Sequence, residues 1–211
     1  MSGLFITLEG GDGAGKTTQS TLLDEWLIAR GERVLRTREP GGTDLGVELR
    51  NIILHRDGHI APRAEALLYA ADRAHHIATQ VRPALQRGEI VIQDRYLDSS
   101  VAYQGAGRII DATEIRDLSL WATEGLLPDL TILLDVDPAT SRTRMAERTT
   151  YDRIEAEKSD FHTRVRDGYL RLAAAEPHRF LVLDASAPIA DLAERISDRV
   201  EQLLPTRAST P

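Results

Sequence analysis

The sequence contains no cysteine among its 211 residues. Disulfides, thiolate metal sites and cysteine nucleophiles are therefore excluded, so any catalytic metal must be bound through oxygen. A chain without cysteine also suits a reducing compartment. We therefore expect a cytoplasmic protein.

Long apolar runs are missing as well. No stretch of about 18 apolar residues is present, which a membrane-spanning helix would need. The apolar run near the start, residues 4–8, is too short for a signal peptide. We therefore expect no contact with a membrane.

Positive charge is scarce relative to negative charge. Lys and Arg together number 26, against 33 Asp and Glu, which gives a formal net charge of -7. A nucleic-acid polymer is bound through many Lys and Arg contacts to its phosphates, so we expect no such partner. Small phosphorylated ligands remain possible, because they need only a local basic cluster.

The pattern of apolar residues predicts the fold class. Short runs rich in β-branched residues predict five buried strands, at residues 4–8, 33–37, 90–93, 130–136 and 180–183. Segments with helical periodicity predict helices at residues 16–30, 44–55, 62–86, 98–104, 111–124, 138–148, 154–175 and 188–203. Alternation of strands and helices implies crossover connections, hence an α/β fold with a five-stranded parallel sheet flanked by helices on both faces.

Length and composition predict a single domain. An apolar content of 42% is enough to bury a substantial core, and no repeat or linker divides the chain. We expect the domain to cover residues 1–204, followed by a flexible tail over residues 205–211.

A glycine-rich segment directly follows the first predicted strand and opens the first predicted helix. Residues 10–17 have the sequence GGDGAGKT, which satisfies the Walker A pattern G-x-x-x-x-G-K-[ST]. Glycines let successive backbone N–H groups curl around a phosphate, and the helix adds its positive end. Lys16 would reach the β- and γ-phosphates of ATP, and the Thr17 hydroxyl would bind Mg²⁺. The residues expected to hold ATP are Gly10, Gly11, Asp12, Gly13, Ala14, Gly15, Lys16, Thr17 and Thr18.

An acid and an arginine follow the third predicted strand. Asp94 would lie at the carboxyl end of a central strand, where such sheets bind ligands, and could orient Mg²⁺ or its waters. The planar guanidinium of Arg95 suits a second phosphate. An ordinary ion pair at the end of a strand is the alternative interpretation.

The turn after the second predicted strand has the sequence TREPGGT at residues 37–43. Its proline and glycines favour a sharp, rigid turn, which could form the wall or hinge of a substrate pocket through Glu39 and Pro40. A purely structural turn is the alternative.

Several motifs together resemble the thymidylate kinase family. They are the Walker loop, the TREPGGT turn, Y-x-x-D-R at residues 69–73, D-R-Y at 94–96 and A-Y-Q-G at 102–105, in the family's order. The resemblance implies phosphoryl transfer from ATP to dTMP, giving dTDP and ADP, with Mg²⁺, on a P-loop kinase fold with a short mobile lid. It also implies a homodimer, with residues 62–86 and 98–124 as candidate interface helices.

The resemblance also implies residue roles in the dTMP pocket. Arg95 holds the acceptor phosphate, with Arg50 close to it. Asp94 is part of the magnesium and catalytic network, and Asp12 and Thr17 join it at the metal. Tyr69 stacks on thymine, and Arg73 bonds a base carbonyl. The resemblance also places Ser100 and Gln104 at the base edge and Tyr103 against the deoxyribose.

A lid is expected over residues 142–155. Arg144 and Arg148 are four apart, where like charges on one helical face repel unless an anion lies between them. The Walker loop lacks the arginine that some thymidylate kinases carry there, so this chain resembles the branch with catalytic arginines in the lid. That role falls to Arg148 and Arg153. A solvated helix with Glu147, Asp152 and Glu155 is the alternative.

Two rival functions stay open at this point. The first is another small kinase of the same superfamily that acts on a different monophosphate or on a nucleoside. The second is a nucleotide-switched binding protein, but the N-K-x-D guanine motif is absent, because the only asparagine, Asn51, precedes Ile52. A nicotinamide enzyme is disfavoured, since Lys16 stands where the last glycine of G-x-G-x-x-G would fall.

Overall fold

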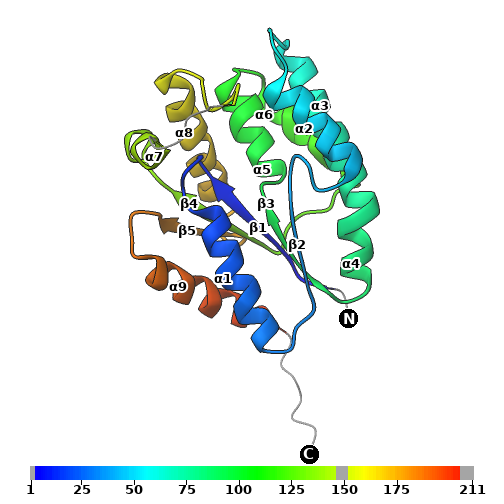
Figure 1. The fold of residues 1–211 in the computed structure, drawn as a ribbon, viewed down its shortest axis with the longest axis vertical. Coiled ribbons are helices and arrows are strands. Elements are labelled where there is room, and N and C mark those ends of the chain that lie inside the picture. The colour runs from blue at the N-terminus through cyan, green and yellow to red at the C-terminus, as the bar shows by residue number, and fades with distance from the viewer. Residues whose placement is uncertain (1–2, 146–151, 205–211) are drawn as a thin grey trace, which may run out of the picture.

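The computed structural model describes residues 3–145 and 152–204. Its centre is a five-stranded parallel sheet with the strand order β2-β3-β1-β4-β5 (Figure 1). The strands are β1 (Phe5–Gly10), β2 (Val34–Arg38), β3 (Ile90–Asp94), β4 (Leu130–Asp135) and β5 (Phe180–Asp184). The predicted parallel sheet and its five strands are confirmed.

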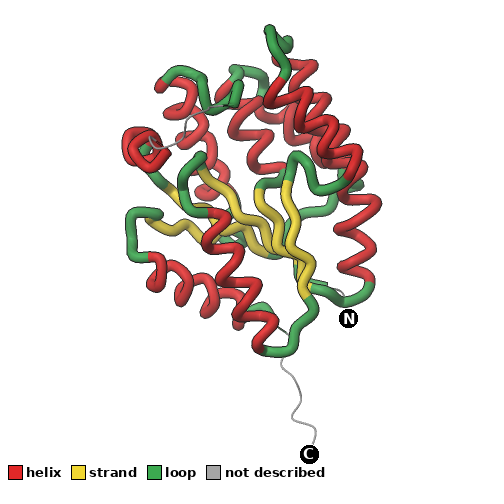
Figure 2. Tube along the Cα trace, in the orientation of Figure 1, coloured by secondary structure: helices red, strands yellow, loops and turns green. Residues whose placement is uncertain are grey.

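Helices cover both faces of this sheet (Figure 2). Side chains alternate between the two faces along a strand, and in β1 Ile6 and Leu8 pack in one cluster with residues of α1 (Lys16–Ala29) and α9 (Ile189–Glu201). Phe5 faces the other way and packs in a cluster with Val81 and Leu97. Figure 1 shows α1 and α9 on the opposite side of the sheet from α4, α5 and α8.

The other helices supply most of the side chains discussed below. They are α2 (Asp44–His55), α3 (Pro62–His76), η1 (Ile77–Val81), α4 (Arg82–Gln86), α5 (Leu97–Ser100), η2 (Val101–Gly107), α6 (Ala112–Ala122), α7 (Pro138–Met145) and α8 (Ser159–Ala175). The predicted helix 62–86 is α3, η1 and α4 in succession, with a π-helical segment in the middle. None of the described helices is long and apolar enough to span a membrane.

Two predicted helices near the expected lid differ from the structure. The helix predicted to begin at residue 154 begins at Ser159 instead. The preceding residues form turns in which the Asp152 carboxylate accepts the backbone N–H groups of Ile154 and Glu155, each at 2.8 Å. A short acidic side chain that bonds nearby N–H groups competes with the helix in this way. The helix predicted over 138–148 is α7 up to Met145, and its last three positions lie outside the described residues.

Candidate active site

A cavity of about 530 Å³ is lined by residues at the carboxyl ends of β2 and β3 and in the loop after β1. Such sheets bind ligands at these strand ends. The predicted site residues that line it are Asp12, Gly13, Gly15, Lys16, Thr17, Glu39, Pro40, Arg50, Tyr69, Arg73, Asp94, Arg95, Ser100, Tyr103 and Gln104. We call the Walker loop, residues 10–17, the cradle, and Arg50, Tyr69, Arg73 and Arg95 the arginine pocket.

The cradle has the backbone that its glycines predict. Gly10 has a φ of 132°, and an added Cβ would lie 2.3 Å from the Leu134 carbonyl oxygen, so only glycine fits there. Lys16 Nζ donates to the carbonyls of Gly10 at 3.2 Å and Gly11 at 2.8 Å. Burial lowers the pKa of Lys16, and the nearby Arg95 lowers it further. The ammonium group thus lies folded against its own loop, at the place where a phosphate would be held.

Arg95 directly follows β3 and lies beside the cradle. Its φ is 66°, in the left-handed region that non-glycine residues seldom adopt. Its N–H donates to the Leu8 carbonyl at 3.0 Å, and its carbonyl accepts the Gln93 side-chain amide at 3.0 Å. Strained backbone of this kind persists only where surrounding contacts hold it, and it clusters at functional sites.

An ion pair joins Arg95 to the cradle. Arg95 Nη2 donates to Asp12 Oδ1 at 2.7 Å and to the Tyr103 hydroxyl at 3.1 Å. Burial alone would raise the pKa of Asp12, but the charges of Arg95 and Lys16 outweigh it and lower that pKa to about 2. Asp12 is therefore ionised at neutral pH. It is bonded to Arg95 and lies close enough to Lys16 to feel its charge.

Asp94, the last residue of β3, has a carboxylate that suits a metal site. Its Oδ1 is buried without a hydrogen-bond partner among the described residues. Leaving such an oxygen unpaired costs free energy, so it indicates where a cation or water completes the site. No group of three acidic or histidine side chains in residues 3–145 and 152–204 could hold a metal ion alone. A single carboxylate such as that of Asp94 fits Mg²⁺, because this ion takes one or two carboxylates together with waters and substrate phosphates.

Arg73 forms the inner wall of the arginine pocket. Its side chain is only 2% exposed, and Nε donates to Glu39 Oε2 at 2.8 Å. Nη1 donates to the Ser100 hydroxyl at 3.1 Å, and Nη2 donates to the Tyr96 carbonyl at 3.0 Å. Glu39 also contacts buried His76 at 3.0 Å. The TREPGGT turn is therefore part of this wall, which favours the pocket interpretation over a purely structural turn.

Arg50 and Tyr69 reach the same pocket from α2 and α3. Arg50 Nη1 donates to the Pro40 carbonyl at 3.0 Å, so the turn also positions this guanidinium. Tyr69 is half-buried and packs against the apolar cluster that contains Leu54 and Tyr103. Burial raises the pKa of its hydroxyl, so the ring remains neutral.

Gln104 and Arg153 share one buried carboxylate. Gln104 Nε2 donates to Glu65 Oε1 at 3.0 Å, and Arg153 Nη2 forms an ion pair with Glu65 Oε2. Arg153 Nε also donates to the Ile53 carbonyl at 2.9 Å, and Arg108 Nε bonds Glu65 at 3.2 Å. Arg153 thus lies at the edge of the arginine pocket and is not among the residues that line the cavity.

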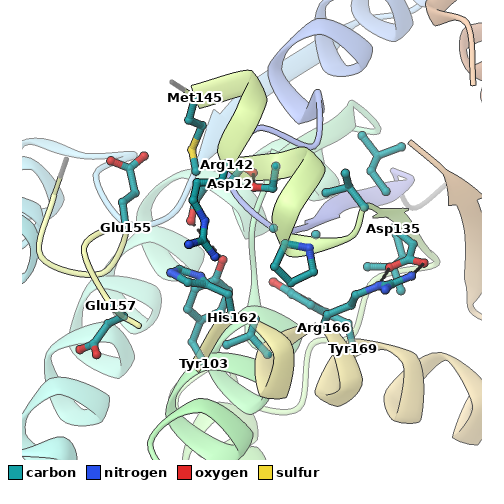
Figure 3. Close-up of a pocket in the computed structure, with 18 of the residues that line it drawn as sticks. Asp12, Tyr103, Asp135, Arg142, Met145, Glu155, Glu157, His162, Arg166 and Tyr169 are labelled. Atoms are coloured by element: carbon teal, nitrogen blue, oxygen red, sulfur yellow. Dashed lines mark hydrogen bonds and ion pairs between the residues drawn. The ribbon is translucent and has the colours of Figure 1, made fainter. Parts of the chain in front are cut away.

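A second cavity, of about 290 Å³, lies on the other side of Asp12 and Tyr103 (Figure 3). Gly10 and Gly11 line this cavity and not the first one. Figure 3 shows Arg142 of α7 pointing toward His162 of α8 across it. Two helices and the outer side of the cradle therefore surround a separate space.

Besides Gly10, Gly11 and Arg153, two predicted site residues do not line the first cavity, and one lies outside the described residues. Ala14 is buried in the core at 2% exposure, and its side chain takes no part in the cavity. Thr18 is exposed on the first turn of α1 and does not line the cavity. Arg148 lies outside the described residues.

Four residues of the site had no predicted role. Arg38 and Ser99 line the cavity, and the Tyr169 hydroxyl accepts from Arg95 Nη1 at 3.2 Å. Glu9 lies beneath them, fully buried. Tyr169 gave no signal in the sequence, because it continues an apolar helical stripe that is typical of a core. Glu9 did give one, since an acid closes an apolar strand there.

The geometry defines a class of protein. A cradle for a nucleoside triphosphate and a pocket of arginines share one cavity at the carboxyl end of a parallel sheet. An ion pair between Arg95 and Asp12 joins them. This is a P-loop phosphotransferase site in which two phosphorylated ligands can meet.

Comparison with known proteins gives the particular family. The family model described as thymidylate kinase matches residues 8–196. The chain is 70% identical over 200 residues to the thymidylate kinase of Leifsonia xyli subsp. xyli (strain CTCB07), covering 94% of this chain and 95% of that protein. It is 67% identical over 210 residues to the thymidylate kinase of Clavibacter sepedonicus, covering 99% and 100%. A crystal structure of thymidylate kinase from Ehrlichia chaffeensis matches with a TM-score of 0.79 at 35% identity, covering 95% of this chain and 100% of that one.

The chain belongs to the thymidylate kinase family: it is a dTMP kinase, which phosphorylates dTMP to dTDP. The family resemblance expected from the sequence is thus confirmed. The roles of individual residues, the metal ion and the assembly are considered next.

Proposed function

We propose that dTMP lies in the arginine pocket with its phosphate against Arg95, facing the γ-phosphate of ATP in the cradle. The observation that carries this proposal is the position of Asp12, which is bonded to Arg95 and close enough to Lys16 for both charges to lower its pKa. The two cations therefore approach the same point from opposite halves of one cavity. Phosphoryl transfer depends mainly on such positioning and on positive charge around the migrating group.

Mg²⁺ would be held by Asp94 and the Thr17 hydroxyl, with Asp12 acting directly or through water. When bound, it would neutralise charge on the β- and γ-phosphates. Lys16 would leave the carbonyls of Gly10 and Gly11 and donate to these phosphates. The lysine leaves only backbone carbonyls behind when it moves, and it leaves no buried carboxylate unpaired.

Thymine would stack on Tyr69, and Arg73, Ser100 and Gln104 would form polar contacts with the edge of the base. Arg73 is held by its buried ion pair with Glu39, so it can present a fixed edge without losing side-chain entropy on binding. Tyr103 would lie against the deoxyribose. Its hydroxyl is bonded to Arg95, so the sugar and phosphate contacts would be coupled.

Arg153 would act in the transition state, together with Arg148, which lies outside the described residues. In this structure Arg153 is bonded to Glu65, so lid closure would exchange the Glu65 carboxylate for phosphate oxygens. The exchange would let one arginine change partners without ever being buried unpaired. We propose this as the lid's contribution to the rate.

A homodimer is supported by apolar surface on the predicted interface helices. Leu67 of α3, Ile109 after η2 and Trp121 of α6 are 57%, 78% and 80% exposed. Large exposed apolar side chains on neighbouring elements are typical of protein interfaces. We also propose that the protein works in the reducing environment of the cytoplasm, as expected for a chain without cysteine.

A coupled ADP-release assay tests the proposed function. Purified protein with ATP and Mg²⁺ is given dTMP, dUMP, dCMP, dAMP and dGMP in turn. We expect dTMP to give the highest kcat/KM, and activity to disappear when EDTA removes Mg²⁺. Equal turnover of all five acceptors, or full activity in EDTA, would contradict the proposed pocket or the proposed metal.

A further inference from the structure

A buried carboxylate lies directly behind Arg95. Glu9 is the fifth residue of β1, and its side chain is 0% exposed. Its Oε1 accepts the Tyr96 backbone N–H at 2.7 Å. Its Oε2 accepts the Ser99 hydroxyl at 2.6 Å and the Tyr169 hydroxyl at 2.9 Å. Glu9 is not among the residues that line either cavity, whereas Ser99 lines the first cavity and Tyr169 lines the second.

The same two hydroxyls also contact Arg95. Arg95 Nη1 lies 3.3 Å from Ser99 Oγ and 3.2 Å from the Tyr169 hydroxyl oxygen. A guanidinium can only donate, so both hydroxyls must accept from Arg95 and direct their own protons elsewhere. Glu9 Oε2 accepts both protons when the carboxylate is ionised, and the two hydroxyl oxygens also lie 2.8 Å from each other. Ser99 and Tyr169 therefore form a two-hydroxyl bridge from Glu9 to Arg95.

Which groups donate and which accept in this bridge depends on the charge of Glu9. An ionised carboxylate accepts from both hydroxyls. A protonated Glu9 donates to one of them instead, and that hydroxyl directs its own proton either to the other hydroxyl, 2.8 Å away, or toward Arg95 Nη1, which is also a donor. In either case the bridge loses the negative charge that draws both hydroxyl protons away from Arg95, so it holds the guanidinium less firmly.

We infer that Glu9 is a positioning residue for the acceptor phosphate: its carboxylate, acting through Ser99 and Tyr169, fixes Arg95 in the orientation that binds dTMP. The inference rests on the proposed role of Arg95. The strained backbone of Arg95 explains the need for such support, because a residue with a φ of 66° requires contacts that hold it.

The surroundings of Glu9 place its titration in the neutral range. Burial, followed by the charge of Asp98 on α5, raises the pKa of Glu9 to about 7, against the opposing effects of Ser99, Arg95 and Tyr169. Asp98 is itself paired with Arg179 at 2.6 Å. From α1, Lys16 is the other charged group close to Glu9. A buried Glu9 with these neighbours would change charge within a pH range in which the enzyme can be assayed.

The test compares Glu9→Gln with the wild type over a pH range from about 6 to about 9. If the oxygen of the new side-chain amide accepts the Tyr96 N–H, the amide NH₂ group faces the two hydroxyls and imitates a protonated Glu9. We expect the variant to raise KM for dTMP about tenfold above pH 8, with KM for ATP changed less than about twofold. In the wild type, KM for dTMP should rise as pH falls through about 7.

The acceptor phosphate itself also titrates, with a pKa near about 6. In Glu9→Gln, KM for dTMP still varies with pH because of this phosphate. Only the part of the variation that comes from the Glu9 carboxyl group is lost. The KM for dTMP of Glu9→Gln, divided by that of the wild type, should therefore fall toward one as pH is lowered below about 7. A constant ratio at every pH would overturn the inference.

Thr7→Val is the matched control. Thr7 is two residues earlier on the same face of β1, equally buried, and bonds Thr131 at 3.1 Å. It tests for a general effect of removing a buried polar group from this strand. Its KM for dTMP should follow the wild-type pH profile, whatever its thermal stability.

Two further variants separate the possible failures. Tyr169→Phe removes one bridging hydroxyl and keeps the ring, so it serves if Glu9→Gln does not fold, and it should raise KM for dTMP about threefold to tenfold. An unchanged KM in Tyr169→Phe would contradict the bridge. Arg95→Lys tests the underlying role: if it leaves KM for dTMP unchanged, the proposed function of Arg95 fails. If Arg95→Lys raises KM while Glu9→Gln and Tyr169→Phe do not, only the Glu9 inference fails.

Discussion

The cradle and the arginine pocket line the same cavity but are built differently. The cradle is eight consecutive residues, and its main phosphate donors are backbone N–H groups and Lys16. The arginine pocket takes one side chain from α2, two from α3 and one from the residue after β3. Before any ligand binds, Lys16 bonds only carbonyls of its own loop, whereas Arg73 is bonded to buried Glu39.

This difference predicts which residues serve the reaction alone and which also stabilise the fold. Lys16 can be replaced without removing the hydrogen-bond partner of a buried carboxylate, so we expect losses in turnover and little effect on folding. An arginine of the pocket also supports the fold, so we expect its loss to reduce both dTMP binding and stability. The predictions below test this division, beginning with the largest expected effect.

Lys16→Met should lower kcat by about 10²–10³-fold, because it removes a donor that acts on charge in the transition state. Circular dichroism on heating should give a Tm close to that of the wild type. A loss of less than about tenfold in kcat would remove Lys16 from the reaction centre. A large fall in Tm would instead show that the cradle also supports the fold.

Arg153→Ala should lower kcat by about 10²-fold or more, with KM for ATP nearly unchanged, because a lid arginine acts mainly in the transition state. Steady-state kinetics with both substrates varied would measure this. Arg108→Ala is the matched control, since Arg108 bonds the same Glu65 but has no proposed role in transfer. Equal kcat losses in the two variants would mean that Glu65, and not phosphate, is the important partner of Arg153.

Arg73→Ala should raise KM for dTMP about tenfold and weaken discrimination among bases. It should also lower the free energy of unfolding by about 3–5 kcal/mol, because Glu39 is left buried without its partner. Urea denaturation would measure this, with the double variant Arg73→Ala/Glu39→Gln as the control. The double variant should recover part of the lost stability, and a purely additive result would contradict the proposed coupling.

Tyr69→Phe should have the smallest effect, changing KM for dTMP by less than about twofold, because the stacking face is retained. Tyr69→Ala should raise it about tenfold, since the stacking surface is lost. Equal effects of the Phe and Ala variants would mean that the hydroxyl, and not the ring, contacts dTMP.

The same division explains what the sequence could predict. The cradle is contiguous, so its spacing and its place between a strand and a helix were enough to identify it. Arg95 was accessible because the end of a central strand is a known position for ligands. The parallel sheet followed from the alternation of apolar strands with helices.

The contacts behind these residues could not be predicted in this way. The bond from Tyr169 to Glu9 joins residues 160 positions apart, and the bond from Arg153 to Glu65 joins residues 88 apart. No local pattern encodes such a pairing. The helix predicted to begin at residue 154 was wrong for a different, local reason, because Asp152 bonds the backbone N–H groups of Ile154 and Glu155.

The central claim is that two phosphate chains meet head to head between Lys16 and Arg95. Isothermal titration with a compound that joins adenosine and thymidine through five phosphates tests this most directly. We predict one site per chain, an affinity at least about 10²-fold tighter than that of dTMP, and a loss of about tenfold or more in both Lys16→Met and Arg95→Lys. An affinity no tighter than that of ATP alone, or binding that is insensitive to Arg95, would contradict the account.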